Sequence, residues 1–321
     1  MRLKSMAVII GVCYGIMAIM PIFVGDIKFI MNLLIMCLIW AVVASSWDVM
    51  MGFAGIFSFG QVAFFVMGAY CSAILAISLN IPPVLAIPLA GLFCAVMGVL
   101  VGLPCLKLAG PYVALVTFGV HMALQAVIKG EIGLALGTRG SWGLLDIPPV
   151  SLFGYPFSSA NMVPTFYLML VVSLACALTI MFMLNSYWGV AFLALKDSHD
   201  FAMSLGVNAF KYKLMVFALT SFLTGIIGGF YGHFYGMLSY HLLDLDLFSI
   251  LMVMMLVGGL GHFPGAILGA FLVVAGSELM SPLGEYRSVA MGGLVVILVL
   301  ALPNGVMGPF LKRLGDKSSP G

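Results

Sequence analysis

The sequence predicts an all-α membrane protein, a polytopic helix bundle of about ten spans. Of its 321 residues, 63% are hydrophobic and only 7% are charged, whereas a water-soluble domain carries about 25% charged residues. The apolar residues gather into runs whose lengths approach the roughly 20 residues that cross a bilayer as a helix. Alternation of period two is not sustained over about ten residues, which argues against a membrane β-barrel, so helices must satisfy the backbone.

Ten apolar runs mark the expected spans, which form one transmembrane domain over residues 1–321. The runs are residues 7–24, 29–44, 61–79, 84–103, 112–128, 165–184, 214–235, 247–258, 265–279 and 289–302. The short eighth and ninth runs are either full spans or re-entrant halves. The basic start and apolar run at the N-terminus resemble a signal peptide, but an A-x-A-type cleavage site is missing, so we expect a retained first span.

Basic residues near the ends of the runs predict the orientation, because cytoplasmic loops carry an excess of Lys and Arg. With a cytoplasmic N-terminus, the larger set lies inside: Arg2, Lys4, Lys107, Lys196, Lys211, Lys213, Lys312, Arg313 and Lys317. The smaller set lies outside: Lys28, Lys129, Arg139 and Arg287. An even number of spans agrees with this division, so both termini are expected in the cytoplasm.

The cysteines fall within or at the ends of apolar runs, at Cys13, Cys37, Cys71, Cys94, Cys105 and Cys176. A C-x-x-C spacing does not occur. We therefore expect small buried hydrophobic residues, with neither a disulfide framework nor a metal site.

Two longer segments stand outside the spans. Residues 129–164 form an expected external loop, rich in Gly, Pro and Ser with aromatic residues, where a partner could dock. Residues 185–213 form an expected cytoplasmic loop that contains an amphipathic piece over residues 192–205, ended by Gly206 as a C-terminal cap. This piece either lies on lipid or docks into another protein.

A run of glycines interrupts the apolar pattern in GFAGIFSFGQVAFF, residues 52–65. Gly52, Gly55 and Gly60 permit a broken helix, which the membrane tolerates only where the backbone is buried in protein or lines a cavity. Ser58 and Gln61 have the spacing of a capping box, in which each side chain bonds the backbone N–H of the other residue. The same helix start also favours an anion, such as an α-carboxylate, so this break is expected to line a pathway.

A similar glycine spacing recurs in GGLGHFPGAILGAF, residues 258–271. Gly258, Gly259 and Gly261 are therefore also candidate pathway residues, and the two breaks are similar in pattern, which a weak internal repeat would explain. Close packing of helices through small residues explains this second pattern at least as well.

Ionisable residues within the spans are few: Asp48, Glu278, His121 and His233. His121 and Gln125 lie one helical turn apart, so they either form an interhelical hydrogen bond or line a polar substrate path. Because a chain of buried carboxylates is missing, ion-driven secondary transport has no evident mechanism.

Catalysis is not expected, because no paired acids, Ser/His pair or H-E-x-x-H motif converge in the sequence. His199, His241 and His262 stand in loops or at span ends without evident partners. A G-x-x-x-x-G-K-[ST] motif is also missing, so this chain is not expected to bind ATP.

Five segments form an ordered set of motifs. They read GFAGIFSFGQVAFFVMGAY, GPYVALVTFG, ALKDSHDFAMSLGVNAFKYKLMVFALTSFLTGIIGGFYG, SILMVMMLVGGLGHFPGAILGA and MGGLVVILVLALPNGVMG. In this order they resemble the LivM-type permease subunits of bacterial branched-chain amino acid ABC importers, from about residue 40 to the end of the chain.

The resemblance implies an ABC importer permease of the ten-helix type in the bacterial cytoplasmic (inner) membrane. It implies a second, LivH-type permease subunit, two cytoplasmic ATPase subunits that bind ATP and Mg, and a periplasmic or lipid-anchored substrate-binding protein. Nucleic acid has no role. Leucine, isoleucine and valine are the cargo that the resemblance suggests, while urea, amides or other amino acids are carried by related permeases.

The resemblance also gives the segment at residues 185–213 a role, because in that family it holds the coupling helix that docks on the ATPase. The positions that match the family pattern are Lys196, Asp197, Ala202 and Gly206. His199 stands where an acid is usual, and Phe201 stands beside Ala202 where two small residues are usual. These departures from the family pattern leave open which ATPase docks on this segment, but they do not affect the expectation that an ATPase docks there.

Overall fold

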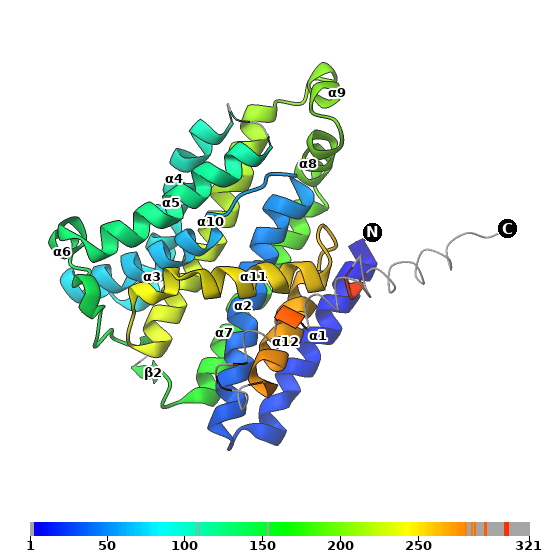
Figure 1. Ribbon diagram of the computed structural model, residues 1–321. Coiled ribbons are helices and arrows are strands. Elements are labelled where there is room, and N and C mark those ends of the chain that lie inside the picture. The colour runs from blue at the N-terminus through cyan, green and yellow to red at the C-terminus, as the bar shows by residue number, and fades with distance from the viewer. Residues whose placement is uncertain are drawn as a thin grey trace.

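The computed structural model describes residues 3–106, 108, 110–152, 154–280, 284, 286, 292–293 and 305–307, and is almost entirely helical (Figure 1). The predicted tenth span, residues 289–302, lies outside the described residues apart from Gly292 and Gly293. Several basic residues used to predict the orientation also lie outside them: Arg2, Lys107, Arg287, Lys312, Arg313 and Lys317.

Seven helices in the described part of the chain are long and apolar enough to cross a membrane. They are α1 (Leu3–Val24), α2 (Lys28–Asp48), α3 (Gln61–Ser78), α4 (Pro83–Cys105), α5 (Pro111–Lys129), α7 (Met162–Leu184) and α10 (Ala209–Tyr235). A π-helical turn, η1 (Val49–Phe53), continues α2. The all-α, polytopic fold class is confirmed.

Two apolar helices are shorter than the others, α11 (Leu245–Gly258) and α12 (Gly265–Leu279), of 14 and 15 residues. At 1.5 Å per residue they extend about 21 Å and about 22 Å, against a hydrocarbon core of about 30 Å. Neither helix is long enough to cross the core alone. The structure therefore favours two re-entrant halves over two full spans.

Helix α10 is the main packing element of one side of the bundle, where it lies along α3 and α4. The backbones approach closely because small residues face one another: a Cβ added at Gly68 would meet the backbone of Gly225. On the other side, α2 packs against α7 and α12, and α1 contacts α7. Small residues at such crossings are typical of membrane bundles.

The segment that follows α5 is ordered by short elements. It contains α6 (Glu131–Leu136), the 3-10 turn η2 (Gly140–Trp142) and a hairpin of β1 (Val150–Leu152) and β2 (Tyr155–Phe157). Backbone bonds between Leu144 and Leu238, of 2.9 and 2.8 Å, tie it to the chain just after α10. Helix α10 begins beside α9 and ends near this hairpin, so the two non-spanning segments occupy opposite ends of the molecule (Figure 1).

The second non-spanning segment forms two helices, α8 (Tyr187–Asp197) and α9 (His199–Ser204). The predicted single amphipathic piece over residues 192–205 is therefore wrong in detail, because Ser198 is extended, with φ −154°, and interrupts it. Gly206 has φ +88° and donates to Met203 O (2.9 Å), while Val207 N donates to Ala202 O (3.1 Å). This pair of bonds is a Schellman cap, so the predicted helix stop at Gly206 is correct.

Candidate functional site

The first break separates η1 from α3, and side chains from neighbouring helices fix its backbone. Residues 54–60 are not helical. The indole Nε1 of Trp47, on α2, donates to Ser58 O over 2.7 Å, and Phe59 N donates to the hydroxyl of Thr117, on α5, over 2.8 Å. The break is thus a fixed structure held between two helices.

The predicted capping box at the start of α3 is wrong. Gly60 is the N-cap residue, without a side-chain cap, and the Ser58 hydroxyl accepts only a long bond of 3.4 Å from Gly60 N. The Gln61 side chain reaches α10 instead, where its Nε2 donates to Thr220 O (3.3 Å) and to the hydroxyl of Thr224. Ser58 and Gln61 are both fully buried. The Gln61 amide nitrogen thus bonds α10 instead of the local backbone.

The two glycine breaks meet each other at Asp48, the last residue of α2. Asp48 is fully buried, and its Oδ1 accepts a 2.7 Å hydrogen bond from Gly261 N, in the turn between α11 and α12. A Cβ added at Gly52 would meet both Asp48 Oδ1 and the backbone of Gly261. The first break therefore packs directly on the second, with no room for a side chain between them.

The segment of residues 185–213 reaches the same place through Lys196, near the end of α8. Its Nζ donates to Gly52 O over 2.6 Å, and its side chain packs against Gly55. We call the group of Asp48, Gly52, Lys196 and Gly261 the junction. It joins α2, α8 and the α11–α12 turn through two hydrogen bonds and one close backbone contact.

An apolar pocket of about 750 Å³ opens beside the first break, between the start of α5 and α11. Four phenylalanines line it, and Ser249 is a polar lining residue. The phenylalanines are Phe57, Phe59, Phe118 and Phe248. Phe248 also contacts Trp47 and Phe59, with ring centroids 5.4 and 5.2 Å apart, so the wall of the pocket is anchored to α2 and to the break.

A second cavity, of about 490 Å³, lies toward α8 and α9. It shares Phe57 and Gly110 with the apolar pocket. Its polar lining consists of Lys196, Lys213 and His199, and no Asp or Glu is among the lining residues that the structure describes. The two cavities are therefore neighbours of opposite character, one aromatic and one cationic.

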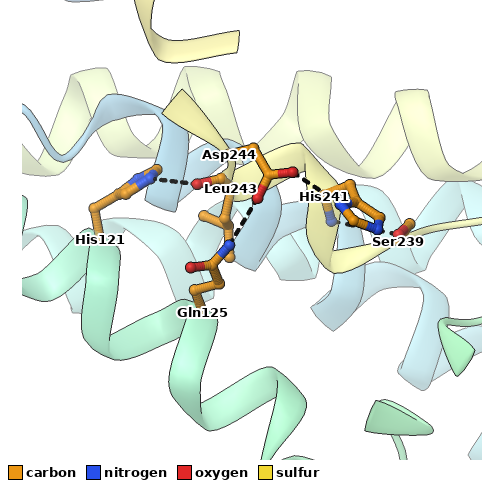
Figure 2. A network of polar contacts seen from close by, with 6 residues as sticks. All are labelled: His121, Gln125, Ser239, His241, Leu243 and Asp244. Carbon is orange, nitrogen blue, oxygen red and sulfur yellow. Dashed lines mark hydrogen bonds and ion pairs between the residues drawn. The ribbon is translucent and has the colours of Figure 1, made fainter. Parts of the chain in front are cut away.

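His121 and Gln125 connect α5 to the chain that leads into α11 (Figure 2). His121 Nε2 donates to Leu243 O (2.9 Å), and Gln125 Nε2 donates to Asp244 Oδ1 (2.9 Å). Asp244 Oδ2 in turn lies 2.8 Å from His241 Nδ1. The His121 ring is buried and stacks on Phe118 at 6.0 Å between centroids. This arrangement matches the interhelical alternative, and it places His121 directly behind the wall of the apolar pocket.

The residues of the second break serve helix packing in the structure. Gly258, at the end of α11, lies against the backbone of Gly265, and Gly259 and Gly261 both have positive φ, of +100° and +74°. The alternative of close packing through small residues therefore accounts for Gly258 and its neighbours. Their link to the first break is Gly261, through Asp48.

The predicted coupling residues differ in exposure. Ala202 is buried against Leu195 and Ala209, which fixes α9 on α8 and on the start of α10. Lys196 and Asp197 are both exposed, but the Nζ of Lys196 reaches back to Gly52 O in the junction. Large apolar side chains remain exposed on these two helices: Tyr187, Trp188, Val190, Leu193, Phe201, Met203 and Leu205. A helix pair with such a surface suits a protein partner or a lipid interface.

Of the predicted pathway residues, Gly55 lines the cationic cavity. Ser58, Gln61 and Gly60 instead contact the neighbouring helices α2, α10 and α5. The contacts of Asp48, Thr117, Thr224 and Phe248 are not predicted from the sequence. Among these four residues, only Asp48 could have been recognised from the sequence, because a carboxylate within a membrane span is costly and marks a functional position. Thr117, Thr224 and Phe248 are ordinary residues for a membrane helix.

Comparison with known proteins identifies the molecular class. A family model described as the permease component of the branched-chain amino acid transport system matches residues 29–302. The chain belongs to this family. Two curated relatives are similar over most of their length, and both are described as the high-affinity branched-chain amino acid transport system permease protein LivM. No solved structure matches the chain significantly.

The relative from Salmonella typhimurium is 28% identical over 305 residues, which cover 88% of this chain and 71% of the relative. The relative from Escherichia coli is 26% identical over 291 residues, covering 84% of this chain and 68% of the relative. The matched region contains both breaks, the junction and residues 185–213. This family member is therefore a multi-pass membrane permease.

Proposed function

We propose that this permease forms half of the translocation pathway of an ATP-driven importer for leucine, isoleucine and valine, in the bacterial inner membrane. The observation that carries this proposal is the apolar pocket with its four phenylalanines beside the first break. Burying the side chain of leucine, isoleucine or valine in an apolar pocket contributes about 1.5–3 kcal/mol to binding. Urea has no apolar group that the pocket would bury. The lining thus favours a branched aliphatic cargo over an amide.

The pathway needs a second subunit to close it. The helices that form the pocket keep apolar residues exposed, with Leu115 of α5 67% exposed and Leu245 of α11 53% exposed. A LivH-type permease packed against α5 and α11 would cover both the residues and the pocket. A periplasmic or lipid-anchored binding protein would then deliver cargo at the end of the molecule that carries the β1–β2 hairpin.

Two cytoplasmic ATPase subunits would supply the energy, one of them docking on α8 and α9. The exposed apolar residues of these helices support the docking, and the buried Ala202 keeps the pair rigid. In this orientation both termini are cytoplasmic. Lys4, Lys196, Lys211 and Lys213 then lie at the cytoplasmic end, as the positive-inside rule expects.

The junction is the proposed route of coupling. A movement of α8 displaces Lys196, which holds Gly52 O at one end of the first break. Because Gly52 packs on Gly261 and Asp48 bonds Gly261 N, the α11–α12 turn must follow. ATP-driven closure of the ATPases would in this way move both broken segments around the apolar pocket together, and so alternate its access.

The test is uptake of labelled leucine and labelled urea by proteoliposomes that contain this chain with its co-encoded permease, ATPases and binding protein. We expect ATP-dependent leucine uptake, and a reduction of about tenfold or more when Phe118→Ser makes the pocket wall polar. Phe23→Ser, on the exposed face of α1, is the matched control, because Phe23 is 79% exposed. Urea uptake in place of leucine uptake would contradict the assigned cargo.

A further inference from the structure

The cationic cavity gathers Lys196, Lys213 and His199, and no Asp or Glu is among the lining residues that the structure describes. The buried carboxylate of Asp48, at the junction, interacts with the charge of Lys196, so Lys213 is the cavity's uncompensated cation. Lys213 is half-buried in its wall, and among the described residues it makes no ion pair or hydrogen bond through its side chain. Lys196 uses one of its three N–H donors on Gly52 O, so two remain. His199 lies 3.7 Å from Asp200, but that carboxylate is 98% exposed and is not part of the lining. Cations that face a partly enclosed space favour an anionic ligand.

The neighbouring pocket identifies the kind of anion. The aromatic pocket and the cationic cavity share Phe57 and Gly110, so one bound molecule can place an apolar end in the first and an anionic end in the second. An aliphatic α-amino acid has this arrangement, with a branched side chain at one end and an α-carboxylate at the other. Inorganic phosphate would satisfy the lysines but would leave the aromatic pocket unused.

We propose that the cationic cavity binds the α-carboxylate of an aliphatic amino acid that enters from the cytoplasmic side, so that internal product slows import. The proposal rests on the proposed function for its cargo and its orientation. Lys196 links the cavity to the junction. A carboxylate bound by its two remaining N–H donors would keep its Nζ in place, bonded to Gly52 O. A ligand that binds one conformation better than another shifts the population toward it. Bound product thus stabilises the junction in the observed conformation and opposes the next cycle.

The experiment uses proteoliposomes that hold the complete complex and are loaded inside with ATP and increasing concentrations of leucine. The initial rate of labelled leucine uptake is compared with the rate at zero internal leucine for each variant. Loss of a hydrogen bond to a charged group costs about 1.5–3 kcal/mol, so Lys213→Gln is expected to raise the half-inhibiting leucine concentration by about tenfold or more. Lys211→Gln is the matched control, since Lys211 is exposed and does not line the cavity.

His199→Gln is a second variant on another element, and it is expected to weaken inhibition in the same direction. Internal leucinol, which lacks the carboxylate, is expected not to inhibit. Equal inhibition of Lys213→Gln and Lys211→Gln by internal leucine would overturn the proposal, and so would inhibition by phosphate with the same potency and the same dependence on Lys213. Absence of ATP-dependent leucine uptake by the unmodified complex would instead overturn the proposed function.

Discussion

At the scale of single residues, the junction depends on one carboxylate and one missing side chain. Asp48 is buried in an apolar bundle, where a polar group is costly unless it is bonded. Its Oδ1 accepts the bond from Gly261 N, which gives this buried side chain one polar partner. Gly52 matters for the opposite reason: it has no Cβ, and this permits the close contact between the two breaks. Each residue gives a separate prediction.

Asp48→Ala is expected to abolish ATP-driven import while the chain still inserts into the membrane. The change leaves Gly261 N–H buried without its acceptor, at a cost of about 1–3 kcal/mol to the junction. Asp48→Asn is the matched control, because its amide oxygen can accept the same bond. Transport and stimulated ATPase are measured on the assembled complex. Normal transport by Asp48→Ala would show that the bond to Gly261 plays no part in coupling.

Gly52→Ala is expected to lower import at least tenfold, because the new Cβ meets Asp48 Oδ1 and the backbone of Gly261. The matched control is Gly119→Ala on α5, where an added Cβ meets nothing within 4 Å. Uptake rates and the amount of complex recovered from membranes are measured together. Equal uptake by both variants would contradict the close contact of the two breaks.

At the scale of elements, the sequence predicts most of the long helices to within a few residues, because hydrophobic runs and flanking polar residues suffice for that. The start of α3 at Gln61 is predicted correctly from its apolar run, and the end of α9 before Gly206 is predicted correctly from that glycine. The prediction of a capping box is wrong because the Gln61 amide bonds to α10, a contact that the local sequence does not reveal. The division of the amphipathic piece at Ser198 is missed for a similar reason, since tertiary contacts of Ala202 set the place of α9.

The cap of α9 gives a prediction for the coupling segment. Gly206→Pro is expected to abolish substrate-stimulated ATPase without preventing insertion, because proline cannot adopt φ +88° and lacks the N–H that bonds Met203 O. Gly206→Asn is the matched control, since asparagine tolerates the left-handed conformation and a side chain there has open space. If Gly206→Pro keeps a fully stimulated ATPase, the α8–α9 pair does not transmit the signal.

At the scale of the whole molecule, the proposed orientation puts the β1–β2 segment and the α8–α9 pair on opposite sides of the membrane. We expect an impermeant thiol reagent to label Trp142→Cys in intact cells, where Trp142 is 87% exposed. Lys211→Cys should react only after the membrane is made permeable. Both variants are built in a background in which the six native cysteines are replaced. Labelling of both from the same side would contradict the proposed orientation.

The central claim is that this permease moves branched-chain amino acids with energy from ATP bound by its partners. The most direct test is labelled leucine uptake by proteoliposomes with the complete complex, measured with internal ATP, without ATP, and without ATP under an imposed proton or sodium gradient. We expect uptake with ATP alone, and none with either gradient alone. Uptake that follows an ion gradient in the absence of ATP would contradict this claim.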